Sequence, residues 1–362
     1  MRYTGMSQSL VDFDVETLAA ELRRRGHNGD HAARILRAYY AASGHVEVEH
    51  LPILKSLRAM LRDEYGHRCS RVITRHESSD GTVKLLLGFD GGGTAEAVLM
   101  PSPANRAGFA AGCVSSQIGC AMGCDFCAST KAGLERNLTA SEIVEQFLRL
   151  REAAAATGRT LKTLVFMGMG EPLHNLDNVI AGIRRIAHPQ MGALGWRQIA
   201  VSTVGIVPGI EKLAAADLGV HLALSLHAPD DETRAQIVPA NRRYAVADII
   251  AAAKAYQVGS GRVVNIEYCL LGGVNDSDHH ARMLADLLAD FRALVNLIPY
   301  NAIGGAGLSG RVYLRPSPAR VTTFLSLLRD AGVVAHVRIT RGDDVAAACG
   351  QLRQRELTQV SS

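Results

Sequence analysis

The stretch "TLVFMGMGEPLHNLDNVIAGIRRIAH", residues 163–188, contains a strand-like run, a glycine-rich turn and a helix-like run in succession. The apolar run "TLVFMG" is typical of a buried strand, and "LDNVIAGIRRIAH" spaces its apolar residues as a helix does. Between them lie Gly168, Gly170 and Glu171, and glycines at such a turn let the backbone approach a ligand closely. This unit predicts a strand and a helix of a parallel α/β sheet.

The same alternation continues to the end of the chain. Strand-like runs are "GCVSSQ", "TLVFMG", "QIAVST", "VHLALSLH", "RVVNIEYCLL", "LVNLIPYN" and "VVAHVRIT", with helix-like runs between them. About six or seven such units predict an α/β fold in the form of a full or partial (β/α) barrel rather than an open sheet. In these barrels the chemistry takes place at the carboxyl ends of the strands, and the motifs described below fall there.

Three domains are expected along the chain. Residues 1–68 contain three short helix-like runs, which predict a small N-terminal helical accessory domain. Residues 69–101 contain the strand-like runs "SRVITRH", "TVKLLLGF" and "AEAVLM", which predict a short β-hairpin extension. Residues 102–362 would form the barrel domain.

Composition sets broad limits on function. The net charge of +4 permits an anionic partner but does not require one. The first residues contain no apolar segment typical of a secretion signal, and no apolar run approaches the roughly 18 residues that cross a bilayer. We therefore expect a cytoplasmic protein without membrane contact. In such a reducing compartment, the clustered members of its seven cysteines indicate a metal site or catalysis rather than structural disulfides.

The cysteine cluster is the motif "GCAMGCDFC", residues 119–127, which spaces Cys120, Cys124 and Cys127 as C-x3-C-x2-C. Three thiolates on one loop can bind three irons of a [4Fe–4S] cluster and leave the fourth iron open to a small molecule such as S-adenosylmethionine. The alternative is a zinc site with Cys113 as the fourth ligand. Zinc ligands more often come as two separated pairs, so the spacing favours the iron–sulfur cluster.

The chain as a whole resembles the RlmN/Cfr family of radical S-adenosylmethionine RNA methyltransferases. The resemblance covers about residues 95–353 and rests on the stretches "CVSSQIGCAMGCDFCA", "RNLTASEIVEQ", "VFMGMGEPLHNLDNVI", "VSTVGIVPGI", "LALSLHAPDDETR", "GGVNDS", "VNLIPYN" and "TRGDDVAAACGQL". It implies two cofactors, a [4Fe–4S] cluster and S-adenosylmethionine.

The resemblance also implies roles for individual residues. Cys120, Cys124 and Cys127 would bind the cluster. The expected contacts to S-adenosylmethionine are Gly170, Glu171, Ser202, Ser225, Leu226, His227 and Asn301. Cys349 matches the cysteine that is methylated and carries the one-carbon unit, Cys113 matches the second catalytic cysteine, and Glu96 matches the proton acceptor.

The mechanism implied by the resemblance uses these groups in order. Cys349 is methylated, its methyl group loses a hydrogen atom to an adenosyl radical, and the resulting carbon adds to adenine and joins protein to RNA. Loss of the ring proton and attack of Cys113 on Cys349 then release methyladenosine and leave a disulfide. Cys69 and Cys269 receive no role and are expected to be small buried apolar residues.

The resemblance implies RNA as the partner. RlmN-type enzymes methylate adenine C2 in 23S ribosomal RNA and often in transfer RNA beside the anticodon, whereas Cfr-type enzymes methylate C8. "MGMGEPL", "NLIPYN" and "TRGDD" favour the RlmN type. We expect a monomer that takes electrons from a flavodoxin or ferredoxin. The arginines of the N-terminal helices would either contact RNA phosphates or form a solvated helical face; they are Arg23, Arg24, Arg25, Arg34 and Arg37. A zinc-stabilised RNA-binding protein without catalysis, and a radical enzyme with a substrate other than RNA, are the alternatives.

Two stretches depart from the family pattern. "CASTKAG" stands where a Thr-Gly pair is expected after the cysteine motif. "NAIGGAGLSGRVYLRPSP", residues 301–318, is longer than the compact loop typical of RlmN. Both lie near the expected site, and the longer loop is expected at its mouth.

Overall fold

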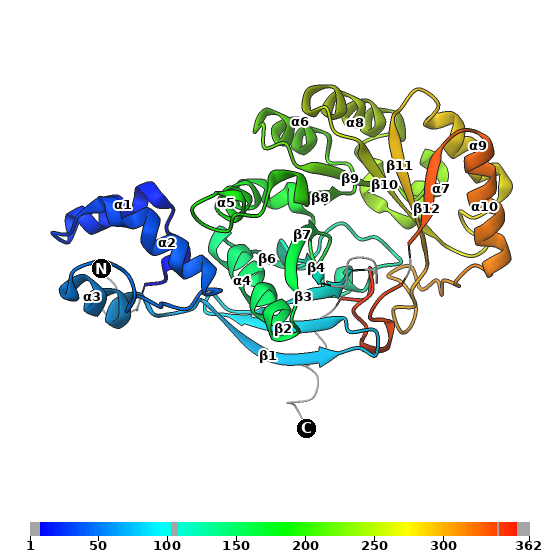
Figure 1. Cartoon of the computed structure of the whole chain (residues 1–362). Helices are drawn as coiled ribbons and strands as arrows, with labels where there is room; N and C mark the ends of the chain where they lie inside the picture. Colours follow the sequence, from blue (N-terminus) through cyan, green and yellow to red (C-terminus); the bar gives the residue numbers. More distant parts are fainter. Residues whose placement is uncertain (1–7, 103–107, 339, 353–362) are drawn as a thin grey trace.

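The computed structural model describes residues 8–102, 108–338 and 340–352 (Figure 1). Residues 1–7 of the predicted N-terminal domain, and residues 103–107, 339 and 353–362 of the predicted barrel domain, lie outside the described part. The α-helices are α1 (Val15–Arg24), α2 (Ala32–Ala41), α3 (Lys55–Tyr65), α4 (Ala140–Ala156), α5 (Leu176–Ala187), α6 (Val207–Ala215), α7 (Asp231–Ile237), α8 (Val246–Ser260), α9 (Asp278–Leu287) and α10 (Pro318–Asp330). The strands are β1 (Ser70–Glu77), β2 (Val83–Phe89), β3 (Thr94–Pro101), β4 (Phe109–Cys113), β5 (Gln117–Gly119), β6 (Leu134–Asn137), β7 (Thr160–Phe166), β8 (Ile199–Thr203), β9 (His221–Ser225), β10 (Val264–Leu270), β11 (Ala293–Pro299) and β12 (Val334–Val337).

One large sheet organises the molecule. Its strand order is β1-β2-β3-β4-β7-β8-β9-β10-β11-β12. The pairs from β4 to β12 are all parallel, while β1 to β4 pair antiparallel. Because the order runs from β1 at one edge to β12 at the other, these two strands do not pair with each other, and the parallel part of the sheet is a partial rather than a full barrel. The predicted α/β fold is confirmed.

The predicted β-hairpin extension is the meander β1–β3, which continues the main sheet through the pairing of β3 with β4. This pairing places Val98 directly opposite Cys113, and β7 places Val165 on the other side of Cys113. Cys113 thus lies inside the sheet rather than at an edge, because its strand β4 is paired on both sides.

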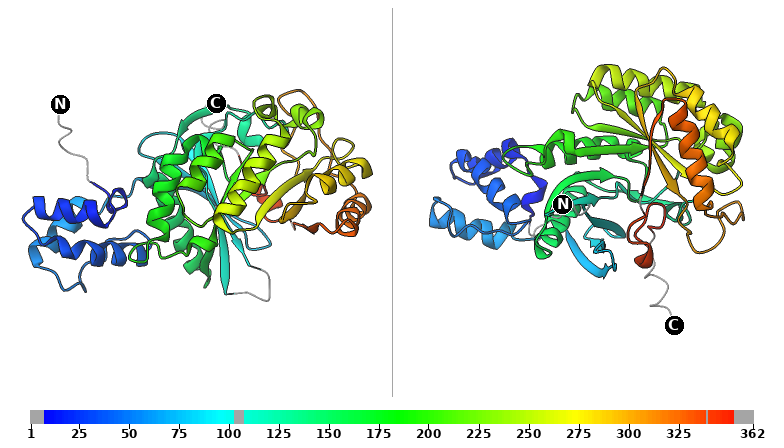
Figure 2. Two further views of the ribbon diagram at one scale, coloured as in Figure 1. Left: turned by 90° about the horizontal axis from the view of Figure 1, so that it is seen from above. Right: turned by 45° about the vertical axis from the view of Figure 1, so that its right-hand side comes forward.

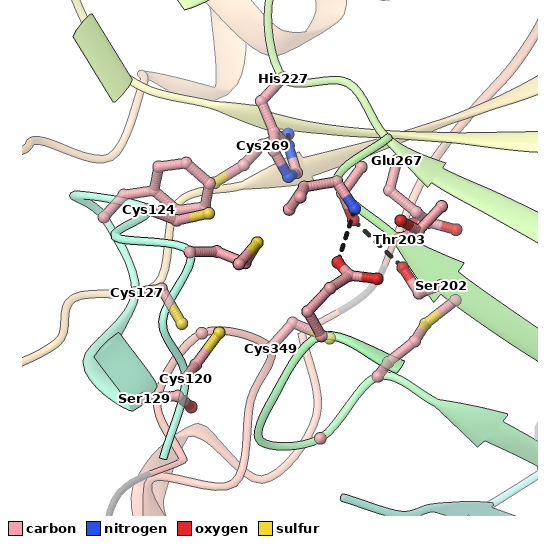
Figure 3. Close-up of a pocket in the computed structure, with 18 of the residues that line it drawn as sticks. Cys120, Cys124, Cys127, Ser129, Ser202, Thr203, His227, Glu267, Cys269 and Cys349 are labelled. Carbon is pink, nitrogen blue, oxygen red and sulfur yellow. Dashed lines mark hydrogen bonds between the residues drawn. The ribbon is translucent and has the colours of Figure 1, made fainter. Parts of the chain in front are cut away.

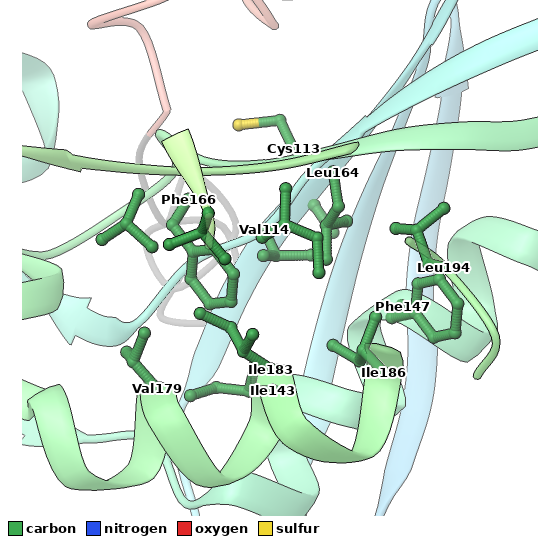
Figure 4. Close-up of a cluster of buried hydrophobic side chains, with 14 of the residues drawn as sticks. Cys113, Val114, Ile143, Phe147, Leu164, Phe166, Val179, Ile183, Ile186 and Leu194 are labelled. Atoms are coloured by element: carbon green, nitrogen blue, oxygen red, sulfur yellow. The ribbon is translucent and has the colours of Figure 1, made fainter. Parts of the chain in front are cut away.

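Helices α4 and α5 cover one face of the sheet around β4 and β7. Their apolar side chains, including Phe147 and Ile183, pack against Leu164 and Phe166 of β7 (Figure 4). These four side chains are at most 1% exposed, and burying one such side chain contributes about 1.5–3 kcal/mol. The packing holds β7 rigidly, and the carboxyl end of β7 carries the glycine-rich turn.

The N-terminal helices α1–α3 form a lobe beside α4 (Figure 2). Helix α1 begins at Asp14, whose Oδ1 accepts a hydrogen bond from the Thr17 backbone N–H at 2.8 Å in a capping box. The lobe reaches the fully buried Glu145 of α4 through the Tyr39 hydroxyl and the Arg68 guanidinium. No helix among the described residues is long and apolar enough to cross a membrane.

Candidate active site

A cavity with an empty volume of about 930 Å³ opens at the carboxyl ends of the parallel strands (Figure 3). The cysteine motif forms one wall, and the ends of β7, β8, β9 and β10 form the others. The predicted site residues that line it are Cys120, Cys124, Cys127, Gly170, Glu171, Ser202, Ser225, His227 and Cys349. Residues far apart in the sequence therefore meet where the barrel architecture places chemistry.

The three motif cysteines point their sulfur atoms into this cavity (Figure 3). Burial raises the pKa of Cys120 to about 12, and burial together with the neighbouring thiolates raises the pKa of Cys124 well above its usual value. These thiols therefore ionise together only when positive charge is bound among them, as in a metal centre. Their chemistry fits an iron–sulfur cluster held by three thiolates.

The alternative to an iron–sulfur cluster at the three motif cysteines is a single zinc ion. In the part of the chain that the structure describes, no group of three or more Cys, His, Asp or Glu side chains is placed to hold one metal ion. A [4Fe–4S] cluster has no such requirement, because each cysteine binds a different iron. Cys113, the fourth ligand of the zinc alternative, lies on the wall of a second cavity instead.

The stretch "CASTKAG", which departs from the family pattern, stabilises the cysteine loop. The Thr130 hydroxyl donates to the carbonyl oxygens of Cys127 at 3.0 Å and of Cys124 at 3.3 Å. Ser129 donates from its hydroxyl to the Leu352 carbonyl at 2.8 Å, and the Ala128 N–H donates to the Gly350 carbonyl. Ala128 and Ser129 of this stretch therefore attach the segment that contains Cys349 to the cysteine loop.

Glu171 is a buried carboxylate with no basic partner among the described residues. Its oxygens accept hydrogen bonds from the N–H groups of Leu173 at 3.0 Å and Val204 at 2.9 Å. Burial raises the pKa of Glu171 to about 7, although these hydrogen bonds lower it. A cationic ligand would offset the cost of burying this charge, which fits the ammonium group of S-adenosylmethionine.

Gly170 allows the turn to approach the floor of the cavity. Its φ of +94° lies in a region that side chains disfavour, and a Cβ there would be 2.5 Å from Cβ of Gln117. The Gln117 side chain in turn accepts a hydrogen bond from the Glu171 N–H at 2.8 Å. The absence of a side chain at Gly170 therefore lets the turn pack against Gln117, and Gln117 in turn holds the backbone of Glu171.

Ser202, Ser225 and His227 lie at the ends of the neighbouring strands β8 and β9. The hydroxyls of Ser202 and Ser225 are 3.1 Å apart and share one hydrogen bond. The His227 Nδ1 accepts from the Cys269 N–H at 3.0 Å, and its ring packs edge-on against Phe126 at 4.8 Å. Burial lowers the pKa of His227 to about 3, so the ring is neutral and carries its proton on Nε2.

Two of the predicted S-adenosylmethionine contacts have other surroundings in the structure. The Leu226 side chain is fully buried in the core, its N–H donates to the Glu267 carbonyl at 3.1 Å, and its carbonyl accepts from Arg234 Nε at 2.8 Å. Asn301 lines the second cavity, where its Nδ2 donates to the Cys349 carbonyl at 3.4 Å and its Oδ1 accepts from Arg315 at 3.1 Å. Asn301 therefore contacts the Cys349 segment directly.

The second cavity, with an empty volume of about 520 Å³, brings Cys113 and Cys349 together. Cys113 points away from the apolar cluster on the other face of β4 (Figure 4). Four residues line both cavities: Met167, Ile298, Arg338 and Cys349. Cys349 thus lies on the wall between the space beside the cysteine motif and the space beside Cys113.

Glu96 lies close to this second cavity but not on its wall as the structure has it. The side chain is buried on β3, and Oε1 is 3.1 Å from the Lys84 ammonium. Because side chains alternate along a strand, Glu96 shares a face with Val98 and Met100, which do line the cavity.

Sequence reasoning missed Arg338 and Glu267. Arg338 lines both cavities, and its guanidinium is 3.7 Å from Glu267 Oε2. Interaction with Cys349 and with the Glu267 carboxylate raises the pKa of Arg338. A signal for both residues was present in the sequence. Glu267 lies inside the strand-like run "RVVNIEYCLL" and Arg338 inside "VVAHVRIT", and a buried charge in such a run is usually paired with an opposite charge.

Comparisons with known proteins identify the family. The Radical SAM superfamily pattern matches residues 114–285. The chain is 53% identical to the probable dual-specificity RNA methyltransferase RlmN 1 of Opitutus terrae, over 97% of this chain and 98% of that protein. It is 43% identical to the probable dual-specificity RNA methyltransferase RlmN of Moorella thermoacetica, over 96% of each.

A solved structure agrees with these relatives. The crystal structure of a radical SAM methyltransferase from Sphaerobacter thermophilus superposes with a TM-score of 0.88 at 40% identity, covering 96% of this chain and 99% of that one. The chain therefore belongs to the RlmN family of radical S-adenosylmethionine RNA methyltransferases, which use a [4Fe–4S] cluster and S-adenosylmethionine.

Proposed function

We propose that this enzyme methylates C2 of adenosine in 23S ribosomal RNA, and in transfer RNA beside the anticodon, with Cys349 as the methyl carrier. The observation that carries the proposal is the position of Cys349 on the wall shared by the two cavities. A carrier must meet the source of the methyl group on one side and a releasing thiol on the other. Cys349 borders the cavity of the cysteine motif on one side and the cavity of Cys113 on the other.

The proposed roles divide between cofactors and side chains. When bound, the cluster and S-adenosylmethionine supply the methyl group and the radical chemistry. Cys120, Cys124 and Cys127 would hold the cluster, and Glu171 would hold the ammonium group of S-adenosylmethionine. Further contacts to S-adenosylmethionine would come from Gly170, Ser202, Ser225, His227, Asn301 and the backbone of Leu226.

Arg338 would assist Cys349 by placing a positive charge beside the sulfur atom. A thiolate is the nucleophilic form of cysteine, and a neighbouring guanidinium stabilises it. The pKa of Arg338 is raised by its interaction with Cys349, which supports a guanidinium close to that sulfur.

Release of the product would depend on Glu96 and Cys113. Glu96 would accept the ring proton as a carboxylate, and the adduct would give up its unpaired electron to the iron–sulfur centre, which restores the aromatic ring. Cys113 would then attack Cys349 Sγ, forming a disulfide and breaking the bond between that sulfur and the methylene carbon. The electron pair of the broken bond passes to that carbon, which takes up a proton to become the methyl group of the product. Burial raises the pKa of Cys113 to about 12, so this thiol must lose its proton as it attacks, with Arg338 lowering the cost.

The RNA substrates are proposed on the family relationship and on the surface of the N-terminal lobe. Relatives are named dual-specificity RNA methyltransferases, which supports two kinds of RNA. Residues 1–68 are proposed as the accessory domain, with Arg23, Arg34 and Arg37 contacting phosphates without reading sequence. The enzyme is proposed to act as a monomer and to take electrons from a flavodoxin or ferredoxin.

The test is methylation of ribosomal and transfer RNA fragments by the reduced enzyme, with the modified nucleoside identified by mass spectrometry. We expect 2-methyladenosine from both RNAs, and none from a Cys349→Ala variant that still cleaves S-adenosylmethionine. Detection of 8-methyladenosine instead would refute methylation at C2 and indicate the Cfr-type reaction at C8. Undiminished RNA methylation by Cys349→Ala would refute the carrier role.

A further inference from the structure

The long segment between β11 and α10, residues 302–317, is fastened to the cysteine loop by Asp125. We call this segment the strap. Asp125 Oδ1 accepts a hydrogen bond from the Ser309 N–H at 2.7 Å. Its Oδ2 accepts from the Ser309 hydroxyl at 2.5 Å and from the Tyr313 hydroxyl at 2.7 Å. Asp125 directly follows Cys124, so the strap is tied to the loop that holds three thiols.

The backbone of the strap also fits closely against Asp125. The segment folds into a tight turn, in which the Gly307 N–H donates to the Arg311 carbonyl at 2.8 Å. A methyl group at Gly307 would overlap the Asp125 carbonyl oxygen. Only glycine permits this approach, because any Cβ would meet the backbone of the cysteine loop.

The inner side of the strap is apolar. Ile303 and Tyr313 are buried in one cluster with Cys120, Cys124 and Phe126. An apolar layer around a metal centre controls the access of solvent to it.

The ends of the strap are held independently of Asp125. The Gly272 N–H donates to the Leu314 carbonyl at 2.8 Å, and Gln351 Nε2 donates to the Ala302 carbonyl at 3.0 Å. Loss of the Asp125 contacts would therefore loosen the middle of the strap while both ends stay attached.

We propose that Asp125 is a positioning residue that holds the strap closed over the outer side of the cluster-binding loop and so limits the access of water and dioxygen to the cluster. The proposal rests on the assignment of Cys120, Cys124 and Cys127 as cluster ligands. The observations that support the proposal are three hydrogen bonds to Asp125 and the close approach of the Gly307 backbone to it.

Two variants test the proposal by different routes. Asp125→Asn leaves one side-chain oxygen for the three donors, and Gly307→Ala pushes the strap away while Asp125 stays intact. The holoenzyme is loaded anaerobically and then exposed to air while the visible absorption of the cluster is followed. In parallel, trypsin cleavage after the exposed Arg311 is timed on the same samples. We expect roughly ten-fold faster bleaching and cleavage in both variants, since the lost hydrogen bonds raise the open fraction of the strap.

The matched control is Asp14→Asn, which makes the same chemical change at the start of α1. It is expected to match the wild type in both rates. Bleaching in either strap variant at the wild-type rate, or cleavage after Arg311 at the wild-type rate, would overturn the proposal. If a variant loses iron during purification, Ser309→Ala, which removes one hydroxyl donor to Asp125, replaces it. Faster bleaching and faster cleavage after Arg311 in this variant would support the proposal, and wild-type rates would overturn it.

The ligand assignment is tested separately by iron content. Cys124→Ala is expected to bind less iron after anaerobic reconstitution, whereas Asp125→Asn is expected to bind as much as the wild type. Full iron in Cys124→Ala would refute the ligand assignment, and with it the basis of the strap proposal. Full iron in Asp125→Asn with unchanged bleaching would refute the strap proposal alone.

Discussion

Cys113 and Cys349 line the same small cavity, although Cys113 lies on β4 in the middle of the sheet and Cys349 lies beyond β12, close to the end of the described chain. The two segments meet because the stretch directly after Cys349 is hydrogen-bonded to the strap and to the cysteine loop. Hydrogen bonds from Ala128 and Ser129 to that stretch hold it there. Both thiols therefore border one cavity, and Cys349 also lines the cavity of the cysteine motif.

The first prediction concerns Glu171 and pH. Burial raises the pKa of Glu171 to about 7, so the carboxyl is neutral below that pH and charged above it. Binding of an ammonium group needs the charged form. The affinity for S-adenosylmethionine should therefore fall as pH falls through 7, by up to about ten-fold per unit.

The measurement is equilibrium binding of S-adenosylmethionine to wild type and Glu171→Gln across this pH range. The amino group of the ligand titrates identically in both experiments, so the ratio of the two affinities isolates Glu171. We expect the ratio to be largest above pH 7 and to shrink in acid. A ratio that does not change with pH would remove Glu171 from the ammonium site.

The second prediction concerns Gly170. Gly170→Ala combines an unfavourable φ with a Cβ only 2.5 Å from Cβ of Gln117, so we expect the turn to shift and S-adenosylmethionine binding to weaken by more than about ten-fold. Gly158→Ala is the matched control, because Gly158, just after α4, has a φ of +67° but a Cβ added there would meet no atom within 4 Å. The control should lose about 1 kcal/mol of stability and keep its binding. Equal binding by both variants would contradict the close-approach argument.

The third prediction concerns the pair of Arg338 and Glu267. Arg338→Gln leaves the buried Glu267 carboxylate without its cation, and we expect it to lower the free energy of unfolding by about 2–3 kcal/mol. Burial already raises the pKa of Glu267, which shows that its charged form depends on compensation. The double variant Arg338→Gln/Glu267→Gln should recover most of the loss. Anaerobic denaturant unfolding measures both, and a double variant no more stable than the single one would disprove the coupling.

Some of the site could be predicted from sequence because its residues are local. Cys120, Cys124 and Cys127 share one loop, and Gly170 and Glu171 share one turn, so spacing alone brought each set together. The barrel was predictable for a similar reason, since each strand and helix shows its own periodicity.

Other features depend on contacts between distant segments. Glu267 meets Arg338 only because β10 and β12 flank β11 in the sheet. Asp125 contacts Ser309 only because of the way the strap folds, and the strap contains no helix or strand whose periodicity could be recognised in the sequence. Neither pairing has a spacing signal, since sheet order and loop path are set by packing of the whole chain. The shared cavity wall at Cys349 could be inferred only from the family resemblance.

The central claim is that Cys349 carries the methyl group and Cys113 releases it. Its most direct test is the Cys113→Ala variant, incubated anaerobically with reductant, S-adenosylmethionine and RNA, and then digested and mapped by mass spectrometry. We expect a covalent link between RNA and protein, located at Cys349 through one added carbon, together with loss of free methylated product. Normal release of methyladenosine by this variant, with no link at Cys349, would contradict the claim.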